Sequence, residues 1–583
     1  MMRHSRRSFL GSAGAAAASR TREAGPPNIV LILTDDQGYG DLACHGNPVV
    51  RTPNLDRLHA ESVRFTNFHS DPLCAPTRAG LLTGRYAYRC GVTAAYAGRS
   101  ILRRGEVTMA EMLRAAGYRT GIFGKWHLGD NYPYRPTERG FDEAVNCWSG
   151  GVAQAADFWG NDYFDDIYYR NNRPERFRGY CTDVFFHEGL RFIEKHRGRP
   201  FFLYLPTNAP HAPYLVDERY SAPYRKQGVS PVMSAFYGMI TNLDENVGRL
   251  RRRLAALGLE ENTILLFMTD NGSAAGSGPA AEGGTYKGFD GGMRMRKGSN
   301  YDGGHRVPLF VRWPKGGIGG GRDIENLAAH IDLLPTILEL AGAGNPRGAA
   351  FDGLSLTPLQ RSKPGFPGDR THFIQHQQFR VRGELQMENP KPWLNSAVLT
   401  NRWRLVNGEE LFDIAADPRQ QRDIAARNAG VVKRLRESYE KWWGDVTRRF
   451  DECLEIVVGS EQESPSRLTC FDWYGGGGPP NQEAIRKAPW TNGFWAVEVA
   501  QGGRYEVTLR QQPPEAGFPI EGKTARLRIA EVDLSKPIPE NAAAVSFAVV
   551  LRAGKTKMET WFTDSGGRSR GAHYAYVRYL GGV

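Results

Sequence analysis

Cysteine is scarce in this sequence and is not arranged to hold a structural metal ion. The chain has 583 residues and only seven cysteines, and no two of them stand in the Cys-x-x-Cys spacing that zinc sites use. Because the number is odd, at least one cysteine has no disulfide partner in the chain, although Cys453 and Cys470 lie close enough to pair. These features exclude a zinc finger and leave one cysteine to be explained by another role.

The sequence also lacks any apolar run of about 20 residues, the length that a membrane-spanning helix needs. Near the N-terminus, Arg6 and Arg7 precede Phe9 and Leu10 and then a short Gly/Ala run. This pattern resembles a twin-arginine export signal, and a disordered basic leader is the alternative. We expect residues 1–25 to be the signal, and the mature protein to be periplasmic or extracellular with no transmembrane segment.

Positive charge is in excess but is not concentrated in a tail. The chain has 75 Lys and Arg against 63 Asp and Glu, a formal net charge of +12. Because no module that interleaves aromatic and basic residues stands out, nucleic acid is not expected as a partner. The excess is consistent with general solubility or with attraction to polyanions.

Short apolar runs recur along the first half of the chain, at 29–33, 119–124, 201–205 and 264–268. Such continuous runs are typical of strands that are buried on both faces. Helical patterns lie between them, at 53–65, 108–116 and 235–257. Alternating strands and helices predict an α/β fold whose sheet is mostly parallel and is sandwiched by helices.

Each of these four apolar runs is followed directly by polar side chains. Ligands of such folds bind beyond the carboxyl ends of the strands, so the four sets should converge on one site. They are Asp35 and Asp36, then Lys125 and His127, then Asn208 and His211, and finally Asp270 and Asn271.

Asp35, Asp36, Asp270 and Asn271 offer only oxygen atoms as metal ligands. Hard cations prefer oxygen, whereas a zinc site would contain more His or Cys. We therefore predict Ca²⁺ as the first choice and Mg²⁺ as the second. Turn chemistry of Asp and Asn is the alternative for either motif taken alone.

Five basic or titratable side chains are expected around this cation: Arg78, Lys125, His127, His211 and Lys297. A cation ringed by positive charge is electrostatically reasonable only if the substrate brings negative charge. The set therefore predicts a tetrahedral oxyanion, either sulfate or phosphate.

Cys74 is expected at the start of a helix, because Pro76 suits the first helical turn. Backbone N–H groups there favour anions and lower a thiol's pKa, so a simple cysteine nucleophile is one hypothesis. A thiolate is nevertheless a poor ligand for a hard cation. We therefore expect Cys74 to be converted to an oxygen species.

Several motifs of this chain resemble the type I sulfatases, formylglycine-dependent enzymes of the alkaline phosphatase superfamily. CAPTR at 74–78 and LLTGR at 81–85 are similar to the family's C-x-P-S/T-R signature and its downstream L-T-G-R. The resemblance covers about 28–445, leans toward arylsulfatases and N-acetylgalactosamine sulfatases, and implies an alkaline-phosphatase-like fold. The other motifs are NIVLILTDDQGYGDL, TPNLDRL, GYRTGIFGKWHLG, RGFDE, NAPHAPY, TDNG, KGSNYDGGHRVP and LFDIAADP.

The resemblance implies a cofactor and a modified residue. Asp35, Asp36, Asp270, Asn271 and the modified Cys74 would hold the Ca²⁺ ion. A formylglycine-generating enzyme would oxidise Cys74, and the hydrated aldehyde would offer two hydroxyl groups. One would attack sulfur to give a covalent sulfate ester, and the other would let that ester collapse and release sulfate.

The resemblance also assigns roles to the five basic or titratable residues. His127 would act as the base in the collapse, and Arg78 would stabilise the alkoxide. Lys125 would clamp sulfate oxygens, while His211 and Lys297 would bind sulfate and protonate the leaving oxygen.

The rest of the chain predicts further units. We expect an export signal at 1–25, a catalytic domain at 26–370, a smaller sheet-plus-helix subdomain at 371–450, a linker at 451–479 and a β-sandwich at 480–583. Apolar and polar residues alternate on both sides of Gly502-Gly503, which predicts a β-hairpin there. The β-sandwich is expected either to bind carbohydrate or to serve a structural purpose.

The predicted function is hydrolysis of sulfate esters, of sulfated carbohydrates and also of aryl sulfates. One alternative is a phosphonate or phosphate monoester hydrolase of the same superfamily. The other is a non-catalytic binder of sulfated glycan, which would keep Cys74 unmodified.

Overall fold

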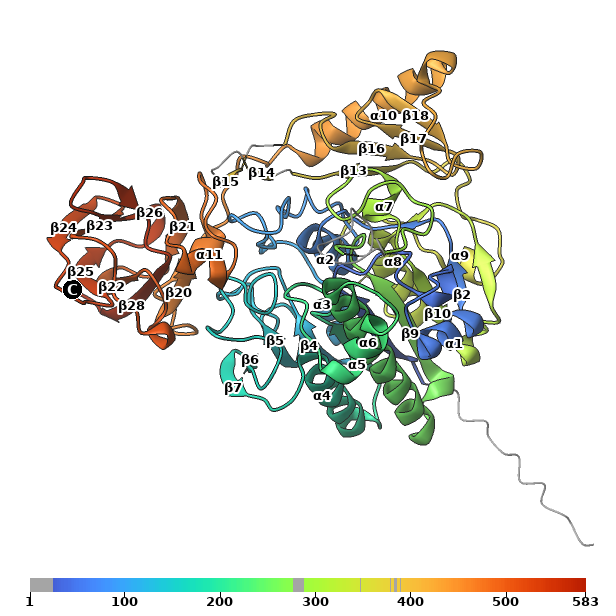
Figure 1. Ribbon diagram of the computed structural model, residues 1–583, viewed down its shortest axis with the longest axis horizontal. Helices are drawn as coiled ribbons and strands as arrows, with labels where there is room; N and C mark the ends of the chain where they lie inside the picture. Colours follow the sequence, from blue (N-terminus) through green and yellow to red (C-terminus); the bar gives the residue numbers. More distant parts are fainter. Residues whose placement is uncertain (1–24, 276–287, 346–347, 378, 382–384, 388–389) are drawn as a thin grey trace, which may run out of the picture.

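The computed structural model describes residues 25–275, 288–345, 348–377, 379–381, 385–387 and 390–583. Its centre is a ten-stranded sheet with the order β11-β2-β10-β9-β1-β8-β4-β5-β6-β7 (Figure 1). The strands β9, β1, β8, β4 and β5 run parallel. The predicted α/β class with a mostly parallel sheet is confirmed. The strands are β1 (Asn28–Thr34), β2 (Val63–Phe65), β4 (Arg119–Lys125), β5 (Glu143–Cys147), β6 (Ile167–Arg170), β7 (Arg173–Arg176), β8 (Phe201–Pro206), β9 (Thr263–Thr269), β10 (Leu309–Arg312) and β11 (Arg322–Ile324).

Helices cover both faces of this sheet. Every residue of β1 is buried, and successive side chains of a strand point to opposite faces. Ile29 and Leu31 pack on the side of α2 (Cys74–Thr83), α3 (Met109–Ala115) and α8 (Leu333–Ala341). Val30 and Ile32 pack on the side of α1 (Pro53–Glu61), α4 (Cys181–His196) and α6 (Pro231–Ala256). The four apolar runs are therefore buried strands, as predicted.

One helix prediction was too long. The pattern at 53–65 predicts a single helix, but α1 ends at Glu61 and the last three residues form β2. Val63 and Phe65 are buried, and β2 pairs with β10 on one side and β11 on the other. Pairing with strands distant in sequence outweighs the local helical pattern.

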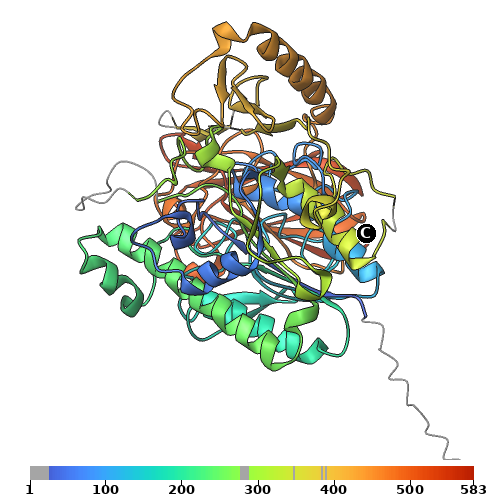
Figure 2. The same ribbon diagram turned by 90° about the vertical axis from the view of Figure 1, so that its right-hand side faces the viewer.

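A smaller antiparallel sheet follows, with the order β13-β16-β17-β18. Its apolar face packs against α10 (Ala429–Val446) through Val398, Leu405, Leu435 and Tyr439. This is the predicted sheet-plus-helix unit, and it lies at the top of Figures 1 and 2. The strands are β13 (His372–Gln375), β16 (Ser396–Leu399), β17 (Trp403–Val406) and β18 (Glu410–Asp413).

The C-terminal region folds into two further sheets that enclose one core. One has the order β19-β21-β26-β23-β24 with β27 beside β26, and the other has the order β20-β28-β22-β25. Trp495 and Phe562 of the first sheet meet Val507 and Phe547 of the second. The strands are β19 (Ile456–Val458), β20 (Ser466–Thr469), β21 (Phe494–Val499), β22 (Gly503–Arg510), β23 (Thr524–Ile529), β24 (Val532–Pro537), β25 (Val545–Leu551), β26 (Gly554–Thr563), β27 (Ser569–Arg570) and β28 (Tyr574–Gly581). The predicted sandwich is present, and we call this unit, residues 454–583, the C-terminal β-domain.

Two details of the predicted C-terminal organisation were wrong. Residues 451–479 were expected to be a linker, but they contain β19 and β20, which pair with β21 and β28. The hairpin at Gly502-Gly503 does not form, because β21 and β22 belong to opposite sheets. Alternation identifies half-buried strands, but it does not identify their partners.

The core of the C-terminal β-domain continues into the unit built on the ten-stranded sheet, residues 26–370, the predicted catalytic domain, which we call the catalytic unit. Tyr96, Ile101 and Tyr134 of that unit belong to the same buried cluster as Trp495. Backbone hydrogen bonds cross the boundary, from Ala155 N to the Pro480 carbonyl at 3.0 Å and from Ala97 N to the Phe471 carbonyl at 2.7 Å. The two units are packed together.

Three other sequence-based expectations concern termini, membranes and disulfides. The predicted export signal at 1–25 lies almost wholly outside the described residues. Among the helices that are described, none is long and apolar enough to cross a bilayer. All seven cysteines are free thiols, so the pair suggested for Cys453 and Cys470 is not formed.

Candidate active site

The predicted site residues converge at the carboxyl edge of the parallel strands. Asp35 and Asp36 follow β1, Asp270 and Asn271 follow β9, and Lys125 ends β4. A backbone hydrogen bond joins the ends of β1 and β9: Asp270 N donates to the Thr34 carbonyl at 3.0 Å. The convergence follows from strand direction, because the carboxyl ends of parallel strands lie on one edge.

Cys74 is the first residue of α2 and is only 2% exposed. All ten residues of this helix are buried, and the helix ends at Gly84, whose φ of 68° suits glycine. Burial raises the pKa of the Cys74 thiol, with Lys125 and Lys297 acting against it. An unmodified Cys74 would therefore be a poor thiolate nucleophile at neutral pH.

Three carboxylates and three cations interlock beside Cys74. Lys125 Nζ lies 2.7 Å from Asp35 Oδ2, and Arg78 Nη2 lies 2.8 Å from Asp270 Oδ2. Lys297 Nζ forms an ion pair with Asp36 and lies 3.7 Å from Cys74 Sγ. The three negative charges balance the three positive ones: Asp35, Asp36 and Asp270 against Lys125, Lys297 and Arg78.

The oxygen atoms of this cluster fit a hard cation. Asp35 Oδ1 and Asn271 Oδ1 are buried and have no hydrogen-bond partner within the described part of the chain. Ligand atoms of Asp35, Asp36 and Cys74 lie within 4.8 Å of one another. Burial and the neighbouring Asp35 carboxylate raise the pKa of Asp270. A bound cation would satisfy the orphaned oxygens and relieve this repulsion.

His127 is held in one tautomer. Its Nε2 lies 2.6 Å from the Ala95 carbonyl, which can only accept, so Nε2 carries the proton. Its Nδ1 is buried and finds no partner among the residues described. Burial, and then Lys125, lower the pKa of His127 well below its usual value. The ring is therefore neutral, with a free lone pair on Nδ1.

The site opens on the side of His211 and Lys297. Their side chains are 16% and 21% exposed, whereas those of Lys125 and Arg78 are fully buried. His211 Nδ1 donates to the Ala212 carbonyl at 2.6 Å, and its Nε2 lies 3.6 Å from Asp36 Oδ2. Burial lowers the pKa of His211 to about 4. A ligand entering from solvent meets these two residues first.

Two groups that the sequence analysis did not single out complete the site. The Ala95 carbonyl orients His127, and the Phe471 ring, from the C-terminal β-domain, lies 6.0 Å from the His127 ring. No motif signals either group, since one is a backbone atom and the other is distant in the sequence.

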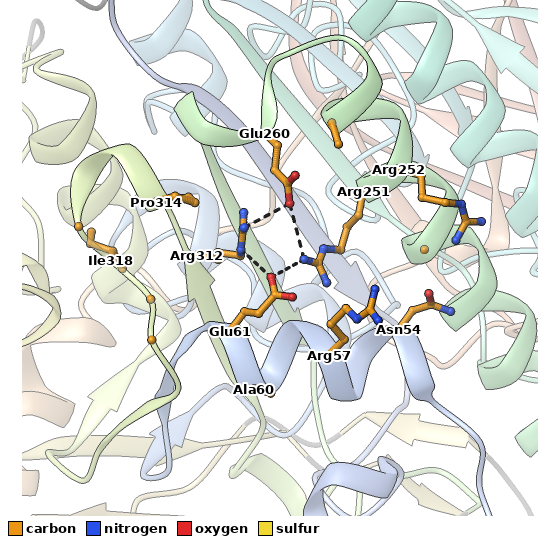
Figure 3. Close-up of a pocket in the computed structure, with 15 residues that line it drawn as sticks. Asn54, Arg57, Ala60, Glu61, Arg251, Arg252, Glu260, Arg312, Pro314 and Ile318 are labelled. Atoms are coloured by element: carbon orange, nitrogen blue, oxygen red, sulfur yellow. Dashed lines mark hydrogen bonds and ion pairs between the residues drawn. The ribbon is translucent and has the colours of Figure 1, made fainter.

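A surface pocket of about 900 Å³ lies at the opposite end of the sheet (Figure 3). There Arg312 and Arg251 bridge Glu61 and Glu260, just before the start of β9. Because it is lined by paired charges and lies at the amino ends of the strands, we distinguish it from the candidate active site.

A helix-sandwiched sheet with buried carboxylates, lysines and histidines at its carboxyl edge defines the alkaline-phosphatase-like class of ester hydrolases. Within that class the chain belongs to the sulfatase family. Residues 27–343 match the Sulfatase family model, and residues 294–442 match the model of the C-terminal part of N-sulphoglucosamine sulphohydrolase. The predicted family is confirmed, and both matches end before β19.

Named relatives agree with this assignment. Human arylsulfatase A is 35% identical over 433 residues, which cover 69% of this chain and 80% of the relative. Mouse N-acetylgalactosamine-6-sulfatase is 36% identical over 356 residues, which cover 57% of this chain and 66% of the relative. The crystal structure of Ps i-CgsB in complex with k-i-k-neocarrahexaose is 26% identical with a TM-score of 0.62, covering 73% of this chain and 94% of that one.

Proposed function

We propose that this protein hydrolyses sulfate esters at a formylglycine made from Cys74, with Ca²⁺ bound beside it, and releases inorganic sulfate. The observation that carries the proposal is the position of Cys74. It begins a buried helix, 3.7 Å from Lys297 Nζ and beside Asp35 and Asp36.

Asp35, Asp36, Asp270, Asn271 and modified Cys74 would hold the calcium ion, which would neutralise charge on the transferring group. Mg²⁺ is the second choice. Because the carboxylates and cations of the cluster already balance, a divalent ion would leave the site with net positive charge. That charge favours an anionic ester.

The basic side chains divide into an inner and an outer set. The buried Lys125 and Arg78 would fix sulfate oxygens and the alkoxide, at positions held by Asp35 and Asp270. His211 and Lys297, at the mouth, would bind sulfate and protonate the leaving oxygen. General acid help of this kind is worth roughly 10²–10⁴ in rate.

His127 would take a proton from the hydroxyl of residue 74 through its free Nδ1. The bond from Nε2 to the Ala95 carbonyl supports this role, because it fixes which nitrogen is the acceptor. The hydrated aldehyde itself would supply the nucleophilic hydroxyl.

The proposed substrates are sulfated carbohydrates, and also aryl sulfates where the mouth admits them. The names of the relatives support a sugar substrate, since two are sulfatases of N-acetylgalactosamine or aryl esters and one structure holds a neocarrahexaose. We also propose that residues 1–25 direct export, and that a formylglycine-generating enzyme acts on the chain.

Mass spectrometry of the tryptic peptide 65–78 tests the modification, using protein made with an active formylglycine-generating enzyme. An aldehyde at residue 74, together with steady turnover of an aryl sulfate, is the expected result. An intact thiol, with a control substrate of the modifying enzyme converted, would overturn it and favour a non-catalytic glycan binder.

The Cys74→Ser variant provides a matched control. A serine can form the ester but lacks the second hydroxyl, so at most one equivalent of phenol per protein is expected. Continuous turnover by this variant would contradict the proposed chemistry. Preference for aryl phosphates or phosphonates over aryl sulfates would favour the alternative hydrolase.

A further inference from the structure

The C-terminal β-domain reaches the proposed catalytic base. Phe471 lies in a short 3-10 turn, η6 (Cys470–Asp472), directly after β20. Its ring centroid is 6.0 Å from that of His127, at an interplanar angle of 46°. Both side chains are buried, each about 3% exposed. An aromatic ring therefore covers one side of the imidazole.

The same residue also holds the loop that orients His127. The Phe471 carbonyl accepts a 2.7 Å hydrogen bond from Ala97 N. Two residues earlier in that loop, the Ala95 carbonyl accepts from His127 Nε2. Between them, the Tyr96 ring lies 6.1 Å from the Phe471 ring. Phe471 thus contacts His127 directly through its ring, and its backbone carbonyl supports the loop that orients His127.

Gly150 closes another side of the imidazole. A Cβ atom at this position would lie 3.2 Å from His127 Nε2 and Cε1, and 3.6 Å from Phe471 Cζ. The Gly150 backbone, the His127 ring and the Phe471 ring are therefore packed against one another. Little room remains for the His127 ring to rotate away from the Ala95 carbonyl.

The turn that carries Phe471 is itself fixed in the C-terminal β-domain. Cys470 N donates to the His573 carbonyl at 2.7 Å, and Cys470 Sγ lies 3.5 Å from the Pro479 carbonyl. Trp473, two residues after Phe471, is fully buried. The β-domain therefore holds the turn that places Phe471 against the catalytic unit.

We propose that Phe471 is a positioning residue for His127, and that the C-terminal β-domain thereby forms part of the catalytic centre. The inference rests on the proposed function, since it concerns the base of that reaction. Phe471 lies beyond both matched family models, which end at residues 343 and 442. The C-terminal β-domain then helps to build the catalytic site, in addition to any carbohydrate that it binds.

Kinetics of the full, matured chain test this proposal. Phe471→Ala is expected to lower kcat for an aryl sulfate by about 10- to 100-fold with little change in KM, because a small misplacement of a reacting group has such effects. Phe471→Leu, which keeps most of the apolar volume, should recover much of the loss. Tyr574→Phe is the matched control, because it removes another contact across the same boundary, the 2.7 Å bond to the Ala155 carbonyl.

A double-mutant cycle separates positioning from general stability. If Phe471 acts through His127, Phe471→Ala should have almost no further effect on kcat in the His127→Ala background. Equal fold-losses in both backgrounds, or an unchanged kcat in Phe471→Ala, would overturn the inference. The melting temperature of each variant is measured in parallel, and if Phe471→Ala fails to fold, Phe471→Leu is used in the cycle.

Nitrogen-15 NMR of labelled histidine provides a readout that does not need turnover. The His127 signals, identified by their loss in His127→Ala, should report a single Nε2–H tautomer in the wild type and a mixture in Phe471→Ala, with Phe471→Leu closer to the wild type. An unchanged tautomer in Phe471→Ala would overturn the inference. If the wild type does not hydrolyse sulfate esters but the tautomer still changes in Phe471→Ala, the proposed function is overturned instead.

Discussion

Lys125 carries a fully buried ammonium group whose charge is balanced by one close carboxylate, Asp35. The two atoms lie 2.7 Å apart, and both side chains are 0% exposed. Burial by itself would lower the pKa of Lys125, but Asp35 raises it above its usual value. Neither charge is tolerable in the interior without the other.

We predict that Lys125→Met destabilises the protein by about 3–5 kcal/mol, because Asp35 is left buried without its partner. Lys195→Met is the matched control, since Lys195 is 62% exposed in its pair with Glu143 and should cost at most about 1 kcal/mol. Urea unfolding of both variants measures the difference. Equal stability losses would contradict the argument.

Calcium should stabilise the folded chain through its buried oxygens. At a free concentration 100 times Kd, one ion that binds only the native state contributes about 2.7 kcal/mol. We predict that a chelator lowers Tm, that added Ca²⁺ restores it, and that Asn271→Ala weakens the effect. Calorimetry measures these shifts, and a Tm insensitive to both chelator and calcium would argue against a calcium site.

The membership of the polar cluster could be predicted because each side chain follows a recognisable apolar run or lies in a motif. Asp35, Lys125 and Asp270 come together because parallel strands end on one edge, where Lys125 and Arg78 pair with the two carboxylates. Phe471 could not be predicted in the same way. Its contact with His127 depends on the packing of two units, which no local pattern records.

Among the helices, α2 is the one whose position matters most to the site, because it carries both Cys74 and Arg78. Its close neighbour is His330, which is 1% exposed. A Cβ atom on Gly80 would lie 2.3 Å from His330 Nε2. The helix can approach this closely only because residue 80 has no side chain.

We predict that Gly80→Ala displaces α2 and costs about 1–3 kcal/mol, as overpacking usually does. Turnover should fall as well, because Cys74 and Arg78 move with the helix. Gly105→Ala is the control, since nothing lies within 4 Å of its added Cβ. Thermal unfolding and activity measure both variants, and a fully active, equally stable Gly80→Ala would refute the close-packing argument.

The strands show where sequence patterns stop being informative. Buried strands such as β1 and β9 could be predicted because their apolar runs are continuous. β2 could not, since its three residues extend a helical pattern and become a strand only by pairing with β10 and β11. The pairing of β19 and β20 was likewise hidden in a stretch that is rich in glycine and polar residues.

In the intact molecule, the catalytic unit and the C-terminal β-domain share one core. Tyr96, Ile101 and Tyr134 are each at least nine-tenths buried, and they belong to the same cluster as the sandwich interior. Tyr134 also donates to the Glu455 carbonyl at 2.7 Å. Removing the β-domain would expose this apolar surface to water.

We predict that a chain ending at residue 453 is less stable than the full chain and loses its activity. The exposed apolar patch favours association, so the shortened protein should also aggregate. Soluble yield, light scattering and aryl sulfate turnover check this outcome. A shortened chain that stays monomeric and fully active would show that the two units are independent.

The burial of Cys74 has a consequence for the order of events during biosynthesis. In the folded chain this thiol is 2% exposed, and the helix around it is wholly buried. An enzyme that modifies it must therefore reach residues 65–78 while they are still unfolded. On the proposed mechanism, folding and modification would then compete as two rates on the newly made chain. The active fraction of a preparation would be decided by that competition, and supplying the modifying enzyme after folding would not raise it.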